Sequence, residues 1–360
     1  MTGGTPEPAP APASGQLATD RLPHLPALDG LRAIAVGLVF IGHSHLLPRF
    51  PASFGVTLFF FLSGYLITTL LRLEQANHGA VNLRHFYLRR LLRINPPLYV
   101  TLALIALLLA MGLNHQPPTA LGVVSQLFFF SNYLPDHGMT SGLQSPLWSL
   151  AVEEHFYLVF PGLFVLAMRK GTSARLAAWC AVACAAVLAV RLVDVALLGI
   201  VGQNGYWTHT RMDSILYGCI LALWSNPAIE RSPPWRAGHV QALLALAAIL
   251  GTFVFPTPLL REGLRYTVQG LALLVLFNWL LQGRPWLDPL LCNPVAQRLG
   301  LWSYSFYLLH YAMLAAFGSS PASPSLIGSL LAIPATALAC EVIHRLIERP
   351  AARLRRRLAD

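Results

Sequence analysis

Residues 50–71, FPASFGVTLFFFLSGYLITTLL, contain no charged side chain. About 20 apolar residues cross the hydrocarbon core of a bilayer as a helix, and this run is long enough to do so. Further uncharged runs follow at 94–135, 195–210, 237–260, 266–283 and 299–340. Of the 360 residues, 55% are hydrophobic and 11% are charged, less than half the charge of a typical soluble domain. The sequence therefore predicts an all-α polytopic membrane protein.

Apolar segments of helical character recur along the chain, at approximately 31–48, 54–71, 96–113, 121–133, 151–168, 175–198, 210–226, 238–255, 264–282, 298–318 and 325–346. The segment 121–133 would reach only about 20 Å as a helix, too short for a hydrocarbon core of about 30 Å. Without it, ten crossings put both termini and most Lys and Arg residues on one side, as the positive-inside rule requires. With it, Arg169–Arg175 would move outside. We therefore expect about ten transmembrane helices, cytoplasmic termini, and a re-entrant or interfacial segment at 121–133.

Composition divides the chain into three regions. Residues 1–25 are predicted to form a disordered Pro/Ala-rich tail, 26–350 the transmembrane domain, and 351–360 a basic cytoplasmic tail. The net charge of +10 lies mostly in short loops between apolar segments, which favours a role in topology over nucleic-acid binding. The five cysteines lack metal-ligand and CxxC spacing, so we expect no metal site.

Two ionisable residues lie in the first apolar segment, where such groups are costly and often mark a functional site. Arg32 and His43 are eleven residues apart, so they share one helix face but are separated by about 16 Å. Arg32, at the cytoplasmic end, either meets a phosphorylated ligand or only pairs with Asp29. His43 lies nearer the outer side and is suited to accept a proton near neutral pH, although a buried structural histidine is also compatible with the pattern.

A second basic pair precedes the third apolar segment. Arg90 and Arg93 have i,i+3 spacing, which places both guanidinium groups on one face of a helix. Such a pair can bind phosphate groups in a bidentate manner. Positive-inside anchoring also explains some of these charges, but it does not require this spacing.

Adjacent carboxylates, Glu153 and Glu154, lie in the stretch WSLAVEEHFY that begins at Trp148. Neighbouring helical positions diverge by about 100°, so one carboxylate could face the core while the other faces elsewhere. Acidic residues near a helix start also suit the helix dipole. A buried carboxylate near His43 could orient the imidazole and stabilise its charged form.

Other polar residues allow either a structural or a substrate-binding interpretation. Ser63 and Tyr65 lie in FFFLSGY, where small residues also favour close helix packing. Arg211 and Asp213 begin another apolar segment, and an internal salt bridge or a substrate contact would explain them.

A third polar stripe lies in the segment 298–318. Ser303, Tyr307 and His310 repeat at i, i+4 and i+7 and share one helix face. Such a stripe can hold helices together or line a site.

Seven motifs occur in a fixed order over about residues 26–350: LDGLRAIAV, FFFLSGY, RRLLRINPP, WSLAVEEHFY, TRMDSILYG, SYSFYLLH and IERP. Together they resemble the acyltransferase-3 family of integral membrane O-acyltransferases, in its stand-alone form without a fused periplasmic domain. His155 departs from the pattern, which usually has Gln. The resemblance implies about ten spans and the O-acylation of envelope carbohydrates or small secondary metabolites, generally with acetyl-CoA on the cytoplasmic side.

We therefore expect an O-acetyltransferase of the bacterial cytoplasmic (inner) membrane. It would move an acetyl group from acetyl-CoA, its cosubstrate, to a hydroxyl of a carbohydrate or lipid-linked glycan acceptor. Acylation of a secondary metabolite such as a macrolide, or transport of a lipid-linked sugar, are the alternatives. His43 would be the general base, oriented by Glu153 or Glu154, and Arg32, Arg90 and Arg93 would bind CoA phosphates. Substrate contacts are expected from Ser63, Tyr65, Trp148, Arg211, Asp213, Tyr307 and His310.

Overall fold

The computed structural model describes residues 24–44, 46–47, 50–113, 118–135, 146–254, 257–320 and 323–357. Most of the predicted N-terminal tail, 1–23, lies outside the described residues. The described residues form helices and contain no strand, which confirms the all-α prediction. The helices are α1 Pro26–His43, α2 Ala52–His78, α3 Leu83–Ala110, α4 Ala120–Leu127, η1 Ser131–Tyr133, α5 Trp148–Lys170, α6 Ser173–Ala196, α7 Thr208–Trp224, α8 His239–Val254, η2 Leu259–Leu264, α9 Arg265–Leu280, η3 Pro285–Leu287, α10 Asp288–Leu291, α11 Pro294–Ala316, α12 Leu326–Ile343, η4 His344–Glu348 and α13 Arg349–Arg357.

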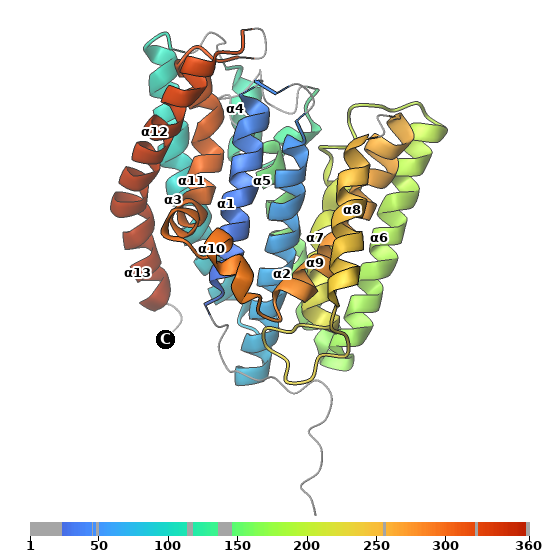
Figure 1. Cartoon of the computed structure of the whole chain (residues 1–360). Coiled ribbons are helices and arrows are strands. Elements are labelled where there is room, and N and C mark those ends of the chain that lie inside the picture. The colour runs from blue at the N-terminus through green and yellow to red at the C-terminus, as the bar shows by residue number, and fades with distance from the viewer. Residues whose placement is uncertain are drawn as a thin grey trace, which may run out of the picture.

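The long helices run side by side in one bundle (Figure 1). Among the described residues, six helices are long and apolar enough to cross a membrane: α1, α2, α3, α5, α6 and α12 with its continuation. A bent helix pair, with a 107° angle between 259–280 and 285–291, raises the number to seven. Helix α8 is apolar but shorter. The chain is thus a multi-pass membrane protein, and the count of ten crossings stays a prediction.

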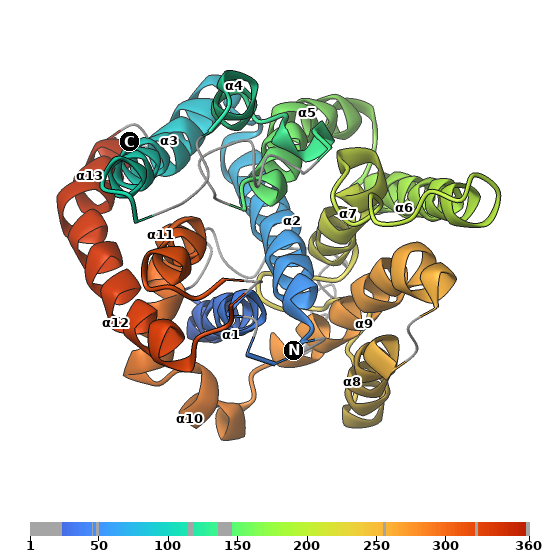
Figure 2. The ribbon, with the colours of Figure 1, turned by 90° about the horizontal axis from the view of Figure 1, so that it is seen from above.

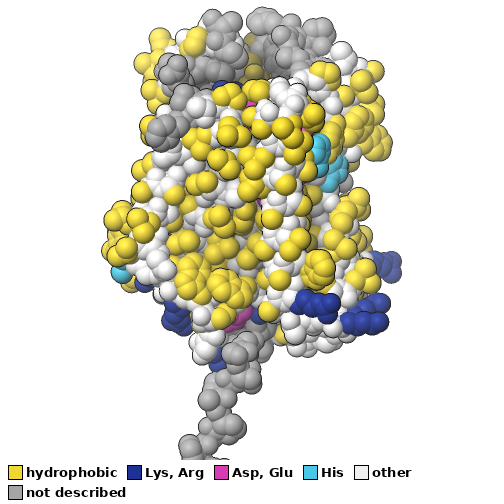
Figure 3. Space-filling model, turned by 90° about the vertical axis from the view of Figure 1, so that its right-hand side faces the viewer, with side chains coloured by type: hydrophobic (Ala, Val, Ile, Leu, Met, Phe, Trp, Pro, Cys, Tyr) yellow, Lys and Arg dark blue, Asp and Glu magenta, His cyan; other side chains and the backbone are white. Residues whose placement is uncertain are grey.

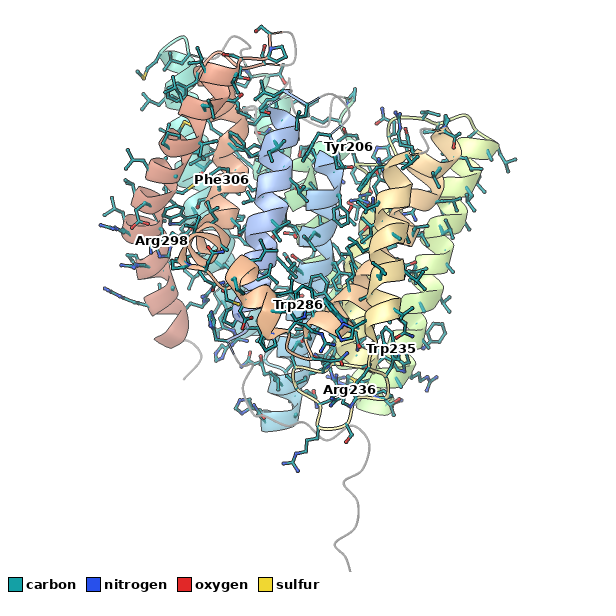
Figure 4. All side chains as sticks on the ribbon, viewed as in Figure 1. Tyr206, Trp235, Arg236, Trp286, Arg298 and Phe306 are labelled. Atoms are coloured by element: carbon teal, nitrogen blue, oxygen red, sulfur yellow. The ribbon has the colours of Figure 1, made fainter. Side chains whose placement is uncertain are left out.

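The outer surface of the bundle matches a lipid environment. In Figure 3 hydrophobic side chains cover the visible face, and Lys and Arg side chains gather towards its lower edge. Trp235, Arg236 and Trp286 lie at this same end of the molecule (Figure 4). Tryptophan and basic residues are typical of the membrane–water interface.

The segment 121–133 is too short to span a membrane, as its length predicted. Helix α4 has only eight residues and is followed by the single turn η1. Side chains hold η1 against α5 and α7, because Asn132 donates to Thr208 Oγ1 at 2.9 Å and His155 Nδ1 lies 2.7 Å from the same oxygen. The histidine that departs from the family pattern therefore helps to link this segment to the bundle.

Helices α1 and α2 occupy the centre of the bundle when it is seen from above (Figure 2). The contact between α2 and α7 is especially close because each helix presents a glycine. A Cβ atom on Gly64 would lie 1.9 Å from the backbone oxygen of Ile215, and one on Gly218 would lie 2.1 Å from that of Phe61. The small residues of FFFLSGY thus serve helix packing, as in other membrane helix interfaces.

We predict that Gly64→Ala lowers the free energy of unfolding in detergent by about 1–3 kcal/mol, because the new methyl group forces α2 away from α7. Gly162→Ala, in α5, is the matched control, since a Cβ atom there meets nothing within 4 Å. The control should be neutral or slightly stabilising, because Ala has the higher helix propensity. Thermal unfolding of both variants measures the difference, and equal midpoints would contradict this account of the α2–α7 contact.

Candidate active site

Two connected cavities penetrate the bundle. The inner cavity lies among α1, α2, α3, α5 and α11, and its polar lining includes Arg32, Ser63, Arg90, Arg93, Ser149, Glu153, Tyr157, Ser303, Tyr304 and Tyr307. The second and larger cavity, here the basic vestibule, is lined by Asp29, Arg32, Leu92, Arg93, Gly300, Leu301, Ser303, Tyr304, His344, Glu348, Arg349, Ala352, Arg353 and Arg355. Both cavities share Arg32, Arg93, Ser303 and Tyr304. The vestibule and the inner cavity therefore adjoin each other at these four residues.

Arginine side chains surround the junction of the two cavities. Arg32 forms a 2.7 Å ion pair with Asp29, as one of the two interpretations predicted, and it also lines both cavities. Arg90 lies over the ring of Tyr157, 3.6 Å from its centroid. Neither Arg90 nor Arg93 forms an ion pair with a carboxylate in the described part of the chain. This junction therefore has an excess of positive charge and can accept an anionic group.

A short hydrogen bond crosses the inner cavity. Ser63 Oγ of α2 donates to Glu153 Oε1 of α5 at 2.6 Å. The neighbouring carboxylate diverges, as the helical geometry predicted: Glu154 does not line either described cavity, and its buried Oε1 has no hydrogen-bond partner among the described residues. Glu153 is thus the carboxylate that a bound ligand would meet.

His43 does not line either described cavity and lies next to another histidine. Its Nδ1 is 2.8 Å from Nε2 of His310, and the two rings are within 21° of parallel, with centroids 5.0 Å apart. We expected Glu153 or Glu154 to orient His43; instead His310 makes the hydrogen bond at Nδ1. Tyr307 links this pair to the cavity region, because it lines the inner cavity and its ring centroid lies 5.7 Å from that of His310.

The family model described as an acyltransferase domain matches residues 25–344, most of the chain. The chain belongs to this acyltransferase family. Its members transfer acyl groups, so the cavities and the histidine pair are the candidate site of an acyl-transferring enzyme.

Relatives of the chain carry the names of O-acetyltransferases. The chain is 27% identical over 349 residues to the peptidoglycan O-acetyltransferase OatA of Listeria monocytogenes. The aligned region covers 91% of this chain and 56% of OatA. It is 30% identical over 353 residues to a Bacillus subtilis protein named "Putative peptidoglycan O-acetyltransferase YrhL". Here the aligned region covers 91% of this chain and 55% of the relative. The chain thus spans about half the length of these relatives. No solved structure matches it.

Five of the predicted substrate contacts lie outside the two described cavities: His310, which is the partner of His43, and Tyr65, Trp148, Arg211 and Asp213. Tyr65 donates to Asn226 at 2.7 Å, and Trp148 packs edge-on against Phe60 and Tyr206. For this pair, the structure therefore favours a role in packing.

The remaining pair belongs to a buried polar network at α6, α7 and α9. Asp213 forms a 2.7 Å ion pair with Arg191, and both side chains are fully buried. Arg211 lies 3.7 Å above the ring centroid of Tyr266 and donates to Thr57. The structural interpretation of Asp213 thus fits, but its partner is Arg191 and not the neighbouring Arg211.

Several residues of the vestibule were not singled out from the sequence. Arg349, Arg353 and Arg355 belong to α13, and their positions near the C-terminus made them look like topology determinants. The IERP motif was the available signal. Glu348 of this motif accepts from Ser305 of α11 at 2.6 Å and lies 2.8 Å from His344, which holds the start of α13 against the vestibule.

We predict that Asp213→Asn lowers the free energy of unfolding by about 3–5 kcal/mol, because it leaves Arg191 buried without a counter-charge. Arg345→Gln is the control: Arg345 is 63% exposed and its partner Glu341 keeps Arg298 as a second counter-charge, so its loss should cost less than about 1 kcal/mol. Thermal unfolding in detergent checks both values. A stable Asp213→Asn protein would return Asp213 to the candidate substrate contacts.

Proposed function

We propose that this acyltransferase moves an acetyl group from acetyl-CoA to a hydroxyl of an envelope carbohydrate. The observation that supports this most strongly is that the arginine-lined vestibule adjoins the inner cavity, whose Tyr307 lies beside His310, the partner of His43. From this we infer a route from the vestibule to His43. On such a route the anionic donor enters at the vestibule, while the base that activates the acceptor lies at the other end.

Acetyl-CoA has the charge distribution that this route requires. Its nucleotide end carries phosphate groups, and arginine binds phosphate through charge-assisted, bidentate hydrogen bonds. In our proposal Arg32, Arg90 and Arg93 bind these phosphates at the junction, and Arg349 and Arg353 add positive charge from α13. The uncharged pantetheine arm then extends along the inner cavity, past the mixed polar and aromatic lining, and brings the thioester to its far end.

In this proposal the chemistry takes place beside Tyr307, which lines the inner cavity and packs against His310, the partner of His43. His43 takes the proton of the acceptor hydroxyl as general base, and the oxygen forms a bond to the thioester carbonyl carbon. The C–S bond then breaks, and the CoA thiolate leaves and is protonated. Arg32 and His43 are eleven positions apart on α1, which is about 16 Å along the helix. The donor arm has to span this distance between the phosphate-binding arginines and the base.

The acceptor reaches the site from the opposite side to the donor. The names of two relatives include peptidoglycan, which supports an envelope glycan as the acceptor. The vestibule is lined by residues of α13, which lies in the lower part of the bundle in Figure 1, towards the end where Lys and Arg gather in Figure 3. The positive-inside rule supports a cytoplasmic location for that end. We therefore place the protein in the bacterial cytoplasmic membrane with both termini inside.

Transfer of labelled acetyl from acetyl-CoA to cell-wall polysaccharide, in membranes that contain the protein, tests this proposal. We predict that His43→Ala lowers kcat at least about 100-fold, the usual contribution of a general base. Arg93→Ala should instead raise KM for acetyl-CoA about tenfold or more, because it removes a charged contact to phosphate.

Arg231→Ala is the matched control for the arginine change, since Arg231 is exposed and does not line either described cavity. It should leave both constants unchanged. An active His43→Ala enzyme would refute the base assignment. If the label appears in a small secreted metabolite and not in polysaccharide, the proposed acceptor is wrong. If the protein transports a sugar without acyl-CoA, the proposed reaction is wrong.

A further inference from the structure

We infer that His310 is a positioning residue: it fixes the tautomer of His43 so that the basic nitrogen of His43 is Nε2. The part played by His43 in transfer rests on the proposed function, whereas the hydrogen-bond pattern rests on geometry alone. His310 thereby takes the place that we expected a carboxylate to fill. The two residues are far apart in sequence and meet where α1 packs against α11.

The protonation of His310 follows from its backbone contacts. Its Nδ1 lies 2.7 Å from the carbonyl oxygen of Tyr307 and 3.2 Å from that of Phe306. Carbonyl oxygens only accept hydrogen bonds, so Nδ1 carries a proton. These contacts come from the turn of α11 that precedes His310, so they also fix the direction of the ring.

The surroundings of His310 favour its neutral form. The side chain is fully buried, and rings of Phe40 and Tyr307 lie beside it. No carboxylate among the described residues forms an ion pair with it. A buried imidazolium without a counter-charge is costly, so His310 stays neutral and its Nε2 is a hydrogen-bond acceptor.

The state of His43 then follows. Because Nε2 of His310 accepts, Nδ1 of His43 donates across the 2.8 Å contact. A neutral imidazole carries one N–H, so Nε2 of His43 holds the lone pair. When Nε2 takes the proton of the acceptor hydroxyl, Nδ1–H keeps donating to His310, and this hydrogen bond becomes stronger because its donor is now charged.

Two substitutions at one position separate positioning from packing. His310→Leu removes the acceptor nitrogen Nε2 and fills the buried site with an apolar side chain. His310→Gln instead offers an amide oxygen as the acceptor for Nδ1 of His43. We expect His310→Leu to lower kcat for acetyl transfer about 10- to 100-fold, with KM for acetyl-CoA unchanged. His310→Gln should stay within about tenfold of the wild type. His78→Leu, at the exposed end of α2, controls for the type of substitution and should have wild-type kinetics.

Nitrogen-15 NMR of histidine-labelled protein in lipid gives a second readout that does not depend on transfer. Signals of His43 and His310 are assigned by their loss in His43→Ala and His310→Leu. The wild type should show His43 protonated on Nδ1, and this preference should disappear in His310→Leu and persist in His310→Gln. Protonation of wild-type His43 on Nε2, or an unchanged His43 signal in His310→Leu, would overturn the inference. If the wild type transfers no acetyl group but shows this tautomer pattern, the proposed function fails and the assignment of His310 stands.

Discussion

A charged side chain inside an apolar helix bundle needs a partner, and this constraint separates the structural arginines from those of the site. Arg191 is fully buried against Asp213, and Arg72 is paired with Glu230 at 2.7 Å. These pairs tie helices together and leave no charge for a ligand. Arg90 and Arg93, in contrast, face a cavity and form no ion pair with a described carboxylate. The excess of positive charge lies where an anionic donor can enter.

Much of the fold was predictable because it follows from composition and length. Uncharged runs of bilayer length predicted the all-α membrane class, and the brevity of 121–133 predicted that it would not cross. The motif residues Arg32, Arg90, Arg93 and Glu153 do line connected cavities. Helical spacing was sufficient here, because each of these residues lies on the face of its helix that points to the centre.

The partners of buried polar groups were not predictable, because they depend on which helices meet. The spacing of residues within α7 could not predict that Asp213 pairs with Arg191, because Arg191 belongs to α6. The i, i+7 relation of Ser303 and His310 correctly placed both on one stripe. It could not show that the stripe extends from the cavity lining to a histidine of α1. The arginines of α13 resembled topology determinants because their spacing does not show that α13 packs against α3 beside the vestibule.

The central claim is that an anionic donor enters through the basic vestibule and reaches towards His43 from within. Cryo-electron microscopy of the protein in lipid nanodiscs with CoA tests this most directly. The account predicts phosphate density beside Arg93 and the arginines of α13, with the pantetheine arm in the inner cavity near Ser63. Nucleotide density at the opposite end of the bundle, on the outer side of the histidine pair, would contradict it.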